Sequence, residues 1–290
     1  MALPRTAARM RKFRSERRSS SREDAPLLLG VVAWIVALIA FFPVLYLVLT
    51  GFKTEAAAVE LPPQLFFDAT LENYEAIFEV DFLPFFVNSI VASVLSTALV
   101  MLLGVPAAYA LALHPPKRSK DVLFFFISTK FLPPAGVIVP LYIIFRDASL
   151  LGTVQGLIIL YTAMNLPIAI WMLRSFFEEV PRDVLDAARV DGANLFREMV
   201  QIVLPMVVPG LVATTFLAII FAWNEFFFAV SLASIGSSTV PIFLVRFVTS
   251  EGLFWAKLSA SCTMAILPIV VLGWVAQRQL VRGLSMGAVK

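Results

Sequence analysis

The stretch "DAARVDGANLFREMVQIVLP", residues 186–205, carries two aspartates, two arginines and a glutamate in a chain that is otherwise strongly apolar. Of the 290 residues, 60% are hydrophobic and 15% are charged, and the mean hydropathy is +0.88. A soluble domain has about 25% charged residues. The polar stretch is therefore expected to connect membrane segments. The apolar runs are continuous rather than alternating, which favours helices over a barrel and predicts an all-α polytopic membrane protein.

Six apolar runs reach the roughly 20 residues that cross a bilayer. They lie at about 27–50, 85–113, 121–145, 154–174, 206–232 and 259–277. Eighteen of the 23 lysines and arginines fall in the two tails and in the second and fourth connections, which the positive-inside rule places in the cytoplasm. We therefore predict a cytoplasmic basic tail over 1–26 and a six-helix transmembrane domain over 27–290, with both termini inside. The cytoplasmic loop that holds the opening stretch covers about 176–205.

Two other interpretations of the basic tail are a cleaved signal peptide and a segment that binds nucleic acid. The apolar run after it is too long for a signal-peptide core and long enough to span, so we expect an uncleaved first helix. Arginines beside a span orient the helix and attract anionic membrane lipid, so nucleic acid is not an expected partner.

The residues needed for several kinds of chemistry are missing from the sequence. Cys262 and His114 are each the only residue of their type, which excludes a cysteine cluster, a histidine-rich metal site and a Cys–His nucleophile pair. No phosphate-binding loop of the form G-x-x-x-x-G-K-[ST] occurs. We therefore expect no enzymatic activity, no catalytic residue, no metal and no cofactor in this chain.

The polar loop itself allows two interpretations. Pro181 suits the first turn of a helix in which apolar residues alternate with acids and arginines, and Gly192 permits a turn before a second helical run. Such a segment could lie on lipid headgroups as an amphipathic connector, or it could dock on another protein. Ala187 and Ala188 would let a partner surface approach closely.

The spacing in this loop resembles that of the permease subunits of bacterial ABC importers. Their signature is Glu-Ala-Ala, three residues, Gly, nine residues, and then Ile-x-Leu-Pro. Here an aspartate replaces the leading glutamate, and all other motif positions match: Asp186, Ala187, Ala188, Gly192, Ile202, Leu204 and Pro205. The resemblance covers most of the chain, through six spans to the tail "QLVRGLSMGAVK".

This resemblance implies that the chain lies in the inner (plasma) membrane of a bacterium. It also implies that the loop contains a coupling helix, which docks on a separate ATPase subunit. It also implies a second, homologous permease subunit, an ATPase dimer that binds ATP and Mg²⁺, and a periplasmic or lipid-anchored solute-binding protein. The alternative is a proton-coupled secondary sugar carrier, of which six helices would be half. A carrier would have no use for a loop that docks on an ATPase.

Polar groups within spans are the default candidates for contact with substrate. We selected five: Lys130, Asn165, Asn224, Glu225 and Trp255. Lys130 precedes Pro133, Pro134 and Pro140, which we expect to disrupt the third span and free carbonyls to face a cavity. Assembly with a neighbouring subunit is the alternative for Lys130, a helix partner for Glu225, and the interfacial aromatic belt for Trp255.

The resemblance is closest to permeases of the carbohydrate branch. "STKFLPP", "EGLFWAKLSA" and the C-terminal tail look like those of permeases for sugar alcohols such as sorbitol or mannitol. Aromatic side chains, a few amides and the lack of an arginine cluster suit a neutral polyhydroxylated carbohydrate. Lys130 is the exception that could admit an anionic sugar.

Overall fold

The computed structural model describes residues 27–249 and 252–288. It consists of helices and one small antiparallel hairpin, in which β1 (Val248–Thr249) pairs with β2 (Gly252–Leu253). The predicted tail over 1–26 lies outside the described residues. The chain divides into two units, residues 1–49 and 50–290, and each is described by itself.

The first unit contains most of α2 (Leu27–Gly51), which matches the first predicted span. This helix is long and apolar enough to cross a membrane. Its side chains between Gly30 and Leu45 are exposed, as expected for a helix that lipid surrounds.

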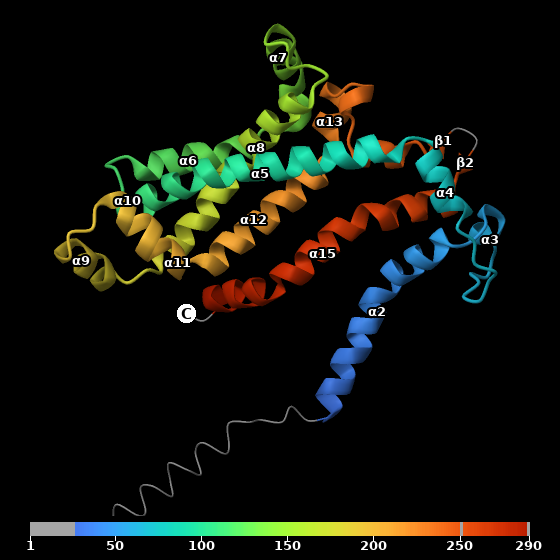
Figure 1. Cartoon of the computed structure of the whole chain (residues 1–290), viewed down its shortest axis with the longest axis horizontal. Helices are drawn as coiled ribbons and strands as arrows, with labels where there is room; N and C mark the ends of the chain where they lie inside the picture. The colour runs from blue at the N-terminus through green and yellow to red at the C-terminus, as the bar shows by residue number, and fades with distance from the viewer. Residues whose placement is uncertain (1–26, 250–251, 289–290) are drawn as a thin grey trace, which may run out of the picture. The chain divides into compact units, whose positions relative to one another are not determined.

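The second unit is built around three long helices, each of which is also long and apolar enough to cross a membrane. These are α5 (Phe82–Leu113), α8 (Val154–Glu178) and α15 (Trp255–Ala288), each longer than the predicted run. α5 packs along α8, and α12 (Val208–Trp223) lies against α5, α8 and α15 (Figure 1). Small buried residues, including Ser93, Ser96 and Gly104 of α5, let the backbones approach closely.

The third predicted span is not one continuous helix. It is split into α6 (Ser119–Thr129) and α7 (Pro134–Asp147), which meet at an angle of 94°. Pro133 and Pro134 cause the break because neither has an N–H to continue the helix of α6. Pro140, which we also expected to disrupt this span, lies inside α7.

The fifth predicted span, 206–232, is also divided. α12 ends at Trp223, and α13 (Phe227–Leu232) is a separate short helix. Before α12, the chain bends by 82° between Met206 and Val208. The described residues therefore contain four continuous candidate spans, or six if each bent pair is counted as one span.

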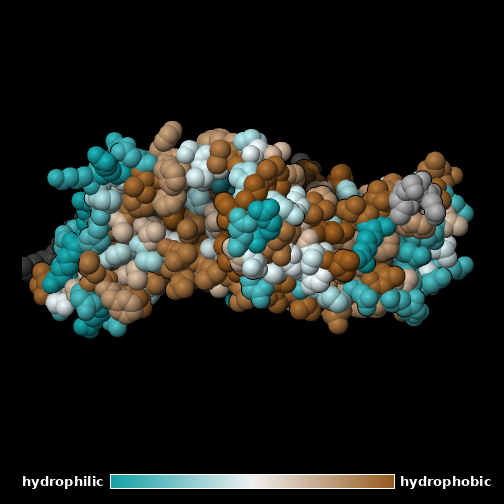
Figure 2. Space-filling model, turned by 90° about the horizontal axis from the view of Figure 1, so that it is seen from above, coloured by the Kyte–Doolittle hydropathy of each residue, from teal (hydrophilic) through white to brown (hydrophobic). Residues whose placement is uncertain are grey.

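The remaining short elements lie at the two ends of the second unit. At one end are α3 (Glu55–Val59), α4 (Glu72–Glu79), η2 (Ile235–Ser237), α14 (Val240–Val245) and the hairpin. At the opposite end of α5 are α9 (Arg182–Val190), α10 (Leu195–Arg197), the π-helical turn η1 (Glu198–Val203) and α11 (Leu204–Met206) (Figure 1). The space-filling view shows a largely hydrophobic face whose hydrophilic surface gathers mainly towards its ends (Figure 2).

Candidate functional site

The polar loop after α8 begins with the short helix α9, and Gly192 ends it. Pro181 precedes the first residue of α9 in an extended conformation. Past the last helical residue, Gly192 has φ +78°, and its N–H donates to the carbonyl of Arg189 at 3.0 Å. The N–H of Ala193 donates to Ala188 at 3.0 Å. This pair of bonds is a Schellman motif, and the left-handed conformation it requires favours glycine. The predicted turn at Gly192 is confirmed.

The two faces of α9 differ in what covers them. Leu185 and Ala188 are buried, and Leu185 belongs to an apolar cluster with the ends of α5 and α8. Asp186 and Ala187 are exposed on the other face. We expected both alanines to receive a partner, but only Ala187 is available because Ala188 packs against this chain itself.

Several large apolar side chains around α9 lie in the open. Val190 is 88% exposed, Phe196 71% and Leu195 62%. Together with Asp186 and Ala187, they form what we call the loop face. An apolar group of this size beside charges is typical of a surface that a partner or lipid covers.

The second half of the motif returns the chain to the membrane helices. The Asn194 side chain accepts the N–H of Arg197 at 2.8 Å and starts α10. Ile202 lies in η1, and Leu204 and Pro205 lie in α11. Ile202 and Leu204 are partly buried and Pro205 is exposed. The structure thus brings the second half of the motif to the helix bend, and Gly192 to a separate turn.

Beneath α9 lies a buried carboxylate that sequence reasoning missed. Glu198 is 1% exposed, and its Oε1 accepts the Tyr109 hydroxyl at 2.6 Å. Its Oε2 accepts the Arg189 Nε at 3.0 Å, and His114 Nε2 lies 3.4 Å from Oε1. The hydrogen bond to Glu198 raises the pKa of the Arg189 guanidinium, which therefore stays charged. The sequence signal for Glu198 is its spacing from the motif: it lies four residues before Ile202, and residues four apart share one face of a helix.

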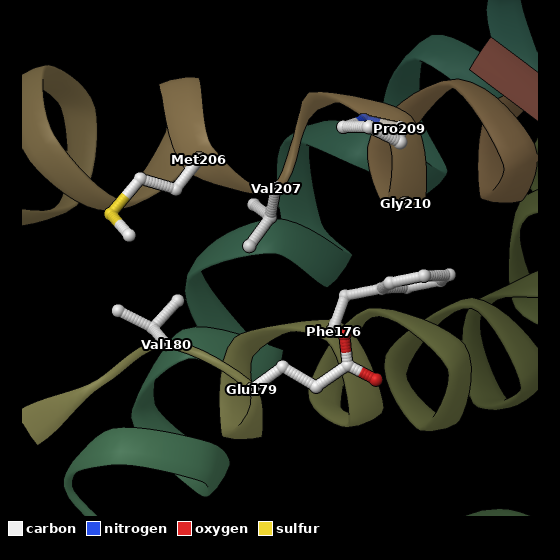
Figure 3. A pocket seen from close by; sticks show the side chains of 7 residues that line it. All are labelled: Phe176, Glu179, Val180, Met206, Val207, Pro209 and Gly210. Atoms are coloured by element: carbon white, nitrogen blue, oxygen red, sulfur yellow. The ribbon is translucent and has the colours of Figure 1, made fainter. Parts of the chain in front are cut away.

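A small cavity of about 80 Å³ marks the bend where the loop rejoins the membrane helices. Phe176, Glu179 and Val180 line it from the end of α8, and Met206, Val207, Pro209 and Gly210 line it from the other side (Figure 3). A Cβ on Gly210 would overlap the Phe176 ring, so only glycine fits this close approach.

A second group of predicted residues lies together deeper among the helices. Lys130, Asn165 and Glu225 line one cavity of about 230 Å³ with Tyr161 and Phe221. Lys130 also lines an adjoining space of about 250 Å³ along α7 and α8. Tyr161 was not predicted, although it lies one helical turn before Asn165 and so on the same face.

Lys130, Asn165 and Glu225 already have partners within the chain, whereas the buried Tyr161 hydroxyl has no hydrogen-bond partner among the described residues. Lys130 is exposed at the end of α6, and its Nζ donates to the carbonyl of Met164 at 2.9 Å. The Asn165 amide is buried and lies 3.5 Å from the carbonyl of Ala218. Glu225 accepts the N–H groups of Phe228 and Ala229, both at 2.9 Å. The Lys130 ammonium, with three donors, keeps hydrogens for a ligand.

Two of the five residues selected within spans lie elsewhere. Asn224 is exposed, and its amide donates to the carbonyl of Ile220 at 2.9 Å. Trp255 is 46% exposed at the start of α15 and lines neither of the two cavities at Lys130.

Comparison with known proteins gives a consistent result. Residues 101–286 match the family model described as binding-protein-dependent transport system inner membrane component. The sulfoquinovosyl glycerol transport system permease protein of Agrobacterium fabrum is 35% identical over 90% of this chain and 92% of its own length. The trehalose transport system permease protein of Mycobacterium tuberculosis is 33% identical over 90% of this chain and 96% of its own length.

One solved structure shares the fold over nearly the whole chain. It is that of a bacterial ABC transporter involved in the import of the acidic polysaccharide alginate. The match has a TM-score of 0.73 and 24% sequence identity, and it covers 90% of this chain and 98% of the other.

Proposed function

Because this chain belongs to the family of binding-protein-dependent inner membrane transport components, we propose that it is the permease subunit of a bacterial ABC importer for a carbohydrate, and that its loop face docks on a separate ATPase. The sequence contains no phosphate-binding loop of the form G-x-x-x-x-G-K-[ST], so ATP-driven movement would require a partner that binds and hydrolyses ATP. The alternative of a self-sufficient proton-coupled carrier is not retained, because the family is defined by dependence on a binding protein.

The observation that carries the docking proposal is the exposure of the loop face. Val190, Leu195 and Phe196 are exposed around a helix whose other face is buried. Covering such side chains is favourable by about 25 cal/mol per Å² of apolar area, so an isolated loop of this kind gains from a partner. Asp186 would add a carboxylate that a cationic side chain of the ATPase can meet.

The proposed assembly contains this chain, a related permease, two copies of the ATPase and an external solute-binding protein. ATP and Mg²⁺ would bind the ATPase alone. A ligand drives a conformational change only if it binds two states differently, so closure of the ATPase dimer around ATP would have to move the loop face.

The direct test is co-purification. A tagged copy of this chain, expressed with the ATPase of its own cell, should retain the ATPase in detergent. Asp186→Lys with Val190→Glu, both on the exposed loop face, should release it. The matched control is Asp68→Lys with Leu65→Glu, at exposed positions in the connection before α4 and outside the predicted spans. Equal retention in the wild type, the loop variant and the control would contradict docking through this face.

For the substrate, we propose a neutral sugar alcohol such as sorbitol or mannitol. An amide, two aromatic side chains, one ammonium and the Glu225 carboxylate line the cavity at Lys130, and these groups together suit hydroxyl groups better than a strongly anionic solute. The two relatives are named for sugar transport systems of other chemistry. Support for a polyol therefore comes from the sequence resemblance and the cavity lining.

Uptake of labelled mannitol, sorbitol, maltose and glycerol phosphate should be compared in cells with and without this gene. Loss of polyol uptake alone is the expected result. Loss of maltose or glycerol phosphate uptake with unchanged polyol uptake would overturn the polyol assignment and leave the importer proposal intact.

A further inference from the structure

Glu198 connects three segments that are otherwise separate in the sequence. It lies at the start of η1, Arg189 lies in α9, Tyr109 lies in the last turns of α5, and His114 follows that helix. Arg189 meets both carboxylate oxygens, at 3.0 Å through Nε and at 3.4 Å through Nη2. Tyr109 and His114 also contact each other at 3.3 Å.

A carboxylate at 1% exposure is costly unless every partner is kept. Tyr109 belongs to the same buried apolar cluster as Leu185, Val203 and Phe177, so few waters can replace the Tyr109 hydroxyl on that side of the carboxylate. The Arg189 side chain is partly exposed and also lies 3.5 Å from Asp186 of the loop face. The same arginine thus meets the loop face on one side and the buried carboxylate on the other.

The apolar contacts beneath α9 do not fix its direction of movement by themselves. Leu185 is the large side chain that α9 buries, and apolar contacts tolerate sliding because they are not directional. Charge-assisted hydrogen bonds have definite lengths and angles. The Glu198 network is the directional contact between α9 and the end of a long membrane helix.

We propose that Glu198 is a positioning residue, which ties the coupling helix α9 to the end of α5 through Arg189 and Tyr109 so that movement of α9 moves α5. The proposal rests on the proposed function, because it needs an ATPase that pushes on the loop face. Its consequence is that loss of the tie lowers the amount of solute moved per ATP hydrolysed, without releasing the ATPase.

The test uses two variants of the full chain in the assembled complex, reconstituted in vesicles. Glu198→Gln removes the charge that holds Arg189 but keeps the volume. Tyr109→Phe removes only the hydroxyl through which α5 contacts Glu198, and it leaves the pair between Glu198 and Arg189. Asp121→Asn is the matched control, because it removes an exposed charge at the start of α6, outside the network and outside the cavity at the bend.

Three quantities are measured: ATPase retained on purification, solute moved per ATP, and amide hydrogen exchange in peptides of α9. Both variants should retain the ATPase and move several-fold less solute per ATP. Glu198→Gln should also speed exchange in α9 by roughly tenfold, the effect of one lost charge-assisted hydrogen bond. Asp121→Asn should match the wild type in all three.

A purely structural role for Glu198 would reduce the yield of complex and leave the solute moved per ATP unchanged, and that result would overturn the proposal. If Glu198→Gln yields no complex, Tyr109→Phe decides by the same ratio. Failure of the wild-type chain to retain any ATPase would instead refute the proposed function.

Discussion

At the scale of single residues, Gly192 decides where α9 ends. Its φ of +78° closes the Schellman motif, and a Cβ placed on it meets no heavy atom within 4 Å. Space therefore does not restrict this position, and the backbone conformation does. A substituted side chain at this φ costs about 1–2 kcal/mol, and more if it is β-branched.

We expect Gly192→Val to abolish most ATP-driven uptake while the external binding protein still binds its solute. Gly192→Asn is the matched variant, because asparagine tolerates the left-handed region, and it should keep uptake close to the wild-type value. The measurement is ATP-driven solute uptake by membrane vesicles that contain the valine or the asparagine variant. Equal uptake by the valine and asparagine variants would show that the turn conformation does not matter for coupling.

At the scale of elements, the break between α12 and α13 is held by one side chain. Glu225 accepts two first-turn amides of α13, and such a carboxylate satisfies N–H groups that a helix start leaves open. α13 packs against α7 and presents Phe228 to the core, so the break also positions the wall of the space beside Lys130.

Glu225→Ala should lower stability by about 1 kcal/mol, because two amides of α13 lose their acceptor. A lower temperature of unfolding of the purified protein in detergent would record it. Glu225→Asp should recover part of the loss, since it keeps a carboxylate. Asn224→Ala, at the exposed neighbouring position, is the control. A control that unfolds as early as Glu225→Ala would exclude a specific cap.

At the scale of the whole molecule, the distribution of charge predicts which end of the second unit faces the cytoplasm. Asp68 lies in the acidic connection before α5, and Asp183 lies in α9 at the opposite end of that helix. Both positions are available for labelling, because Asp183 is exposed and Asp68 lies on an exposed loop.

Single cysteines at these positions in a Cys262→Ala chain test this orientation. A maleimide that cannot cross membranes should label Asp68→Cys in cells whose inner membrane is closed and whose envelope outside that membrane has been removed. It should label Asp183→Cys only after the membrane is opened. Labelling of Asp183→Cys in closed cells would place the loop face outside and contradict ATPase docking.

The sequence by itself determined the helical membrane class, the first, second, fourth and sixth spans, and the turn at Gly192. Each of these depends on local properties: a run of apolar residues, or a glycine where the backbone must turn left-handed. The residues of the motif over 186–205 could be selected for the same reason, since their spacing along the chain is local.

Only the tertiary structure decided which polar residues meet. Glu198, Arg189 and Tyr109 are brought together because α9 contacts η1 and η1 in turn contacts the end of α5, and their spacing in the chain does not predict this. The same holds for Lys130, Asn165 and Glu225, which share a cavity because two predicted spans break at Pro133 and Asn224. Such contacts depend on the path of the chain between helices, and apolar periodicity carries no information about that path.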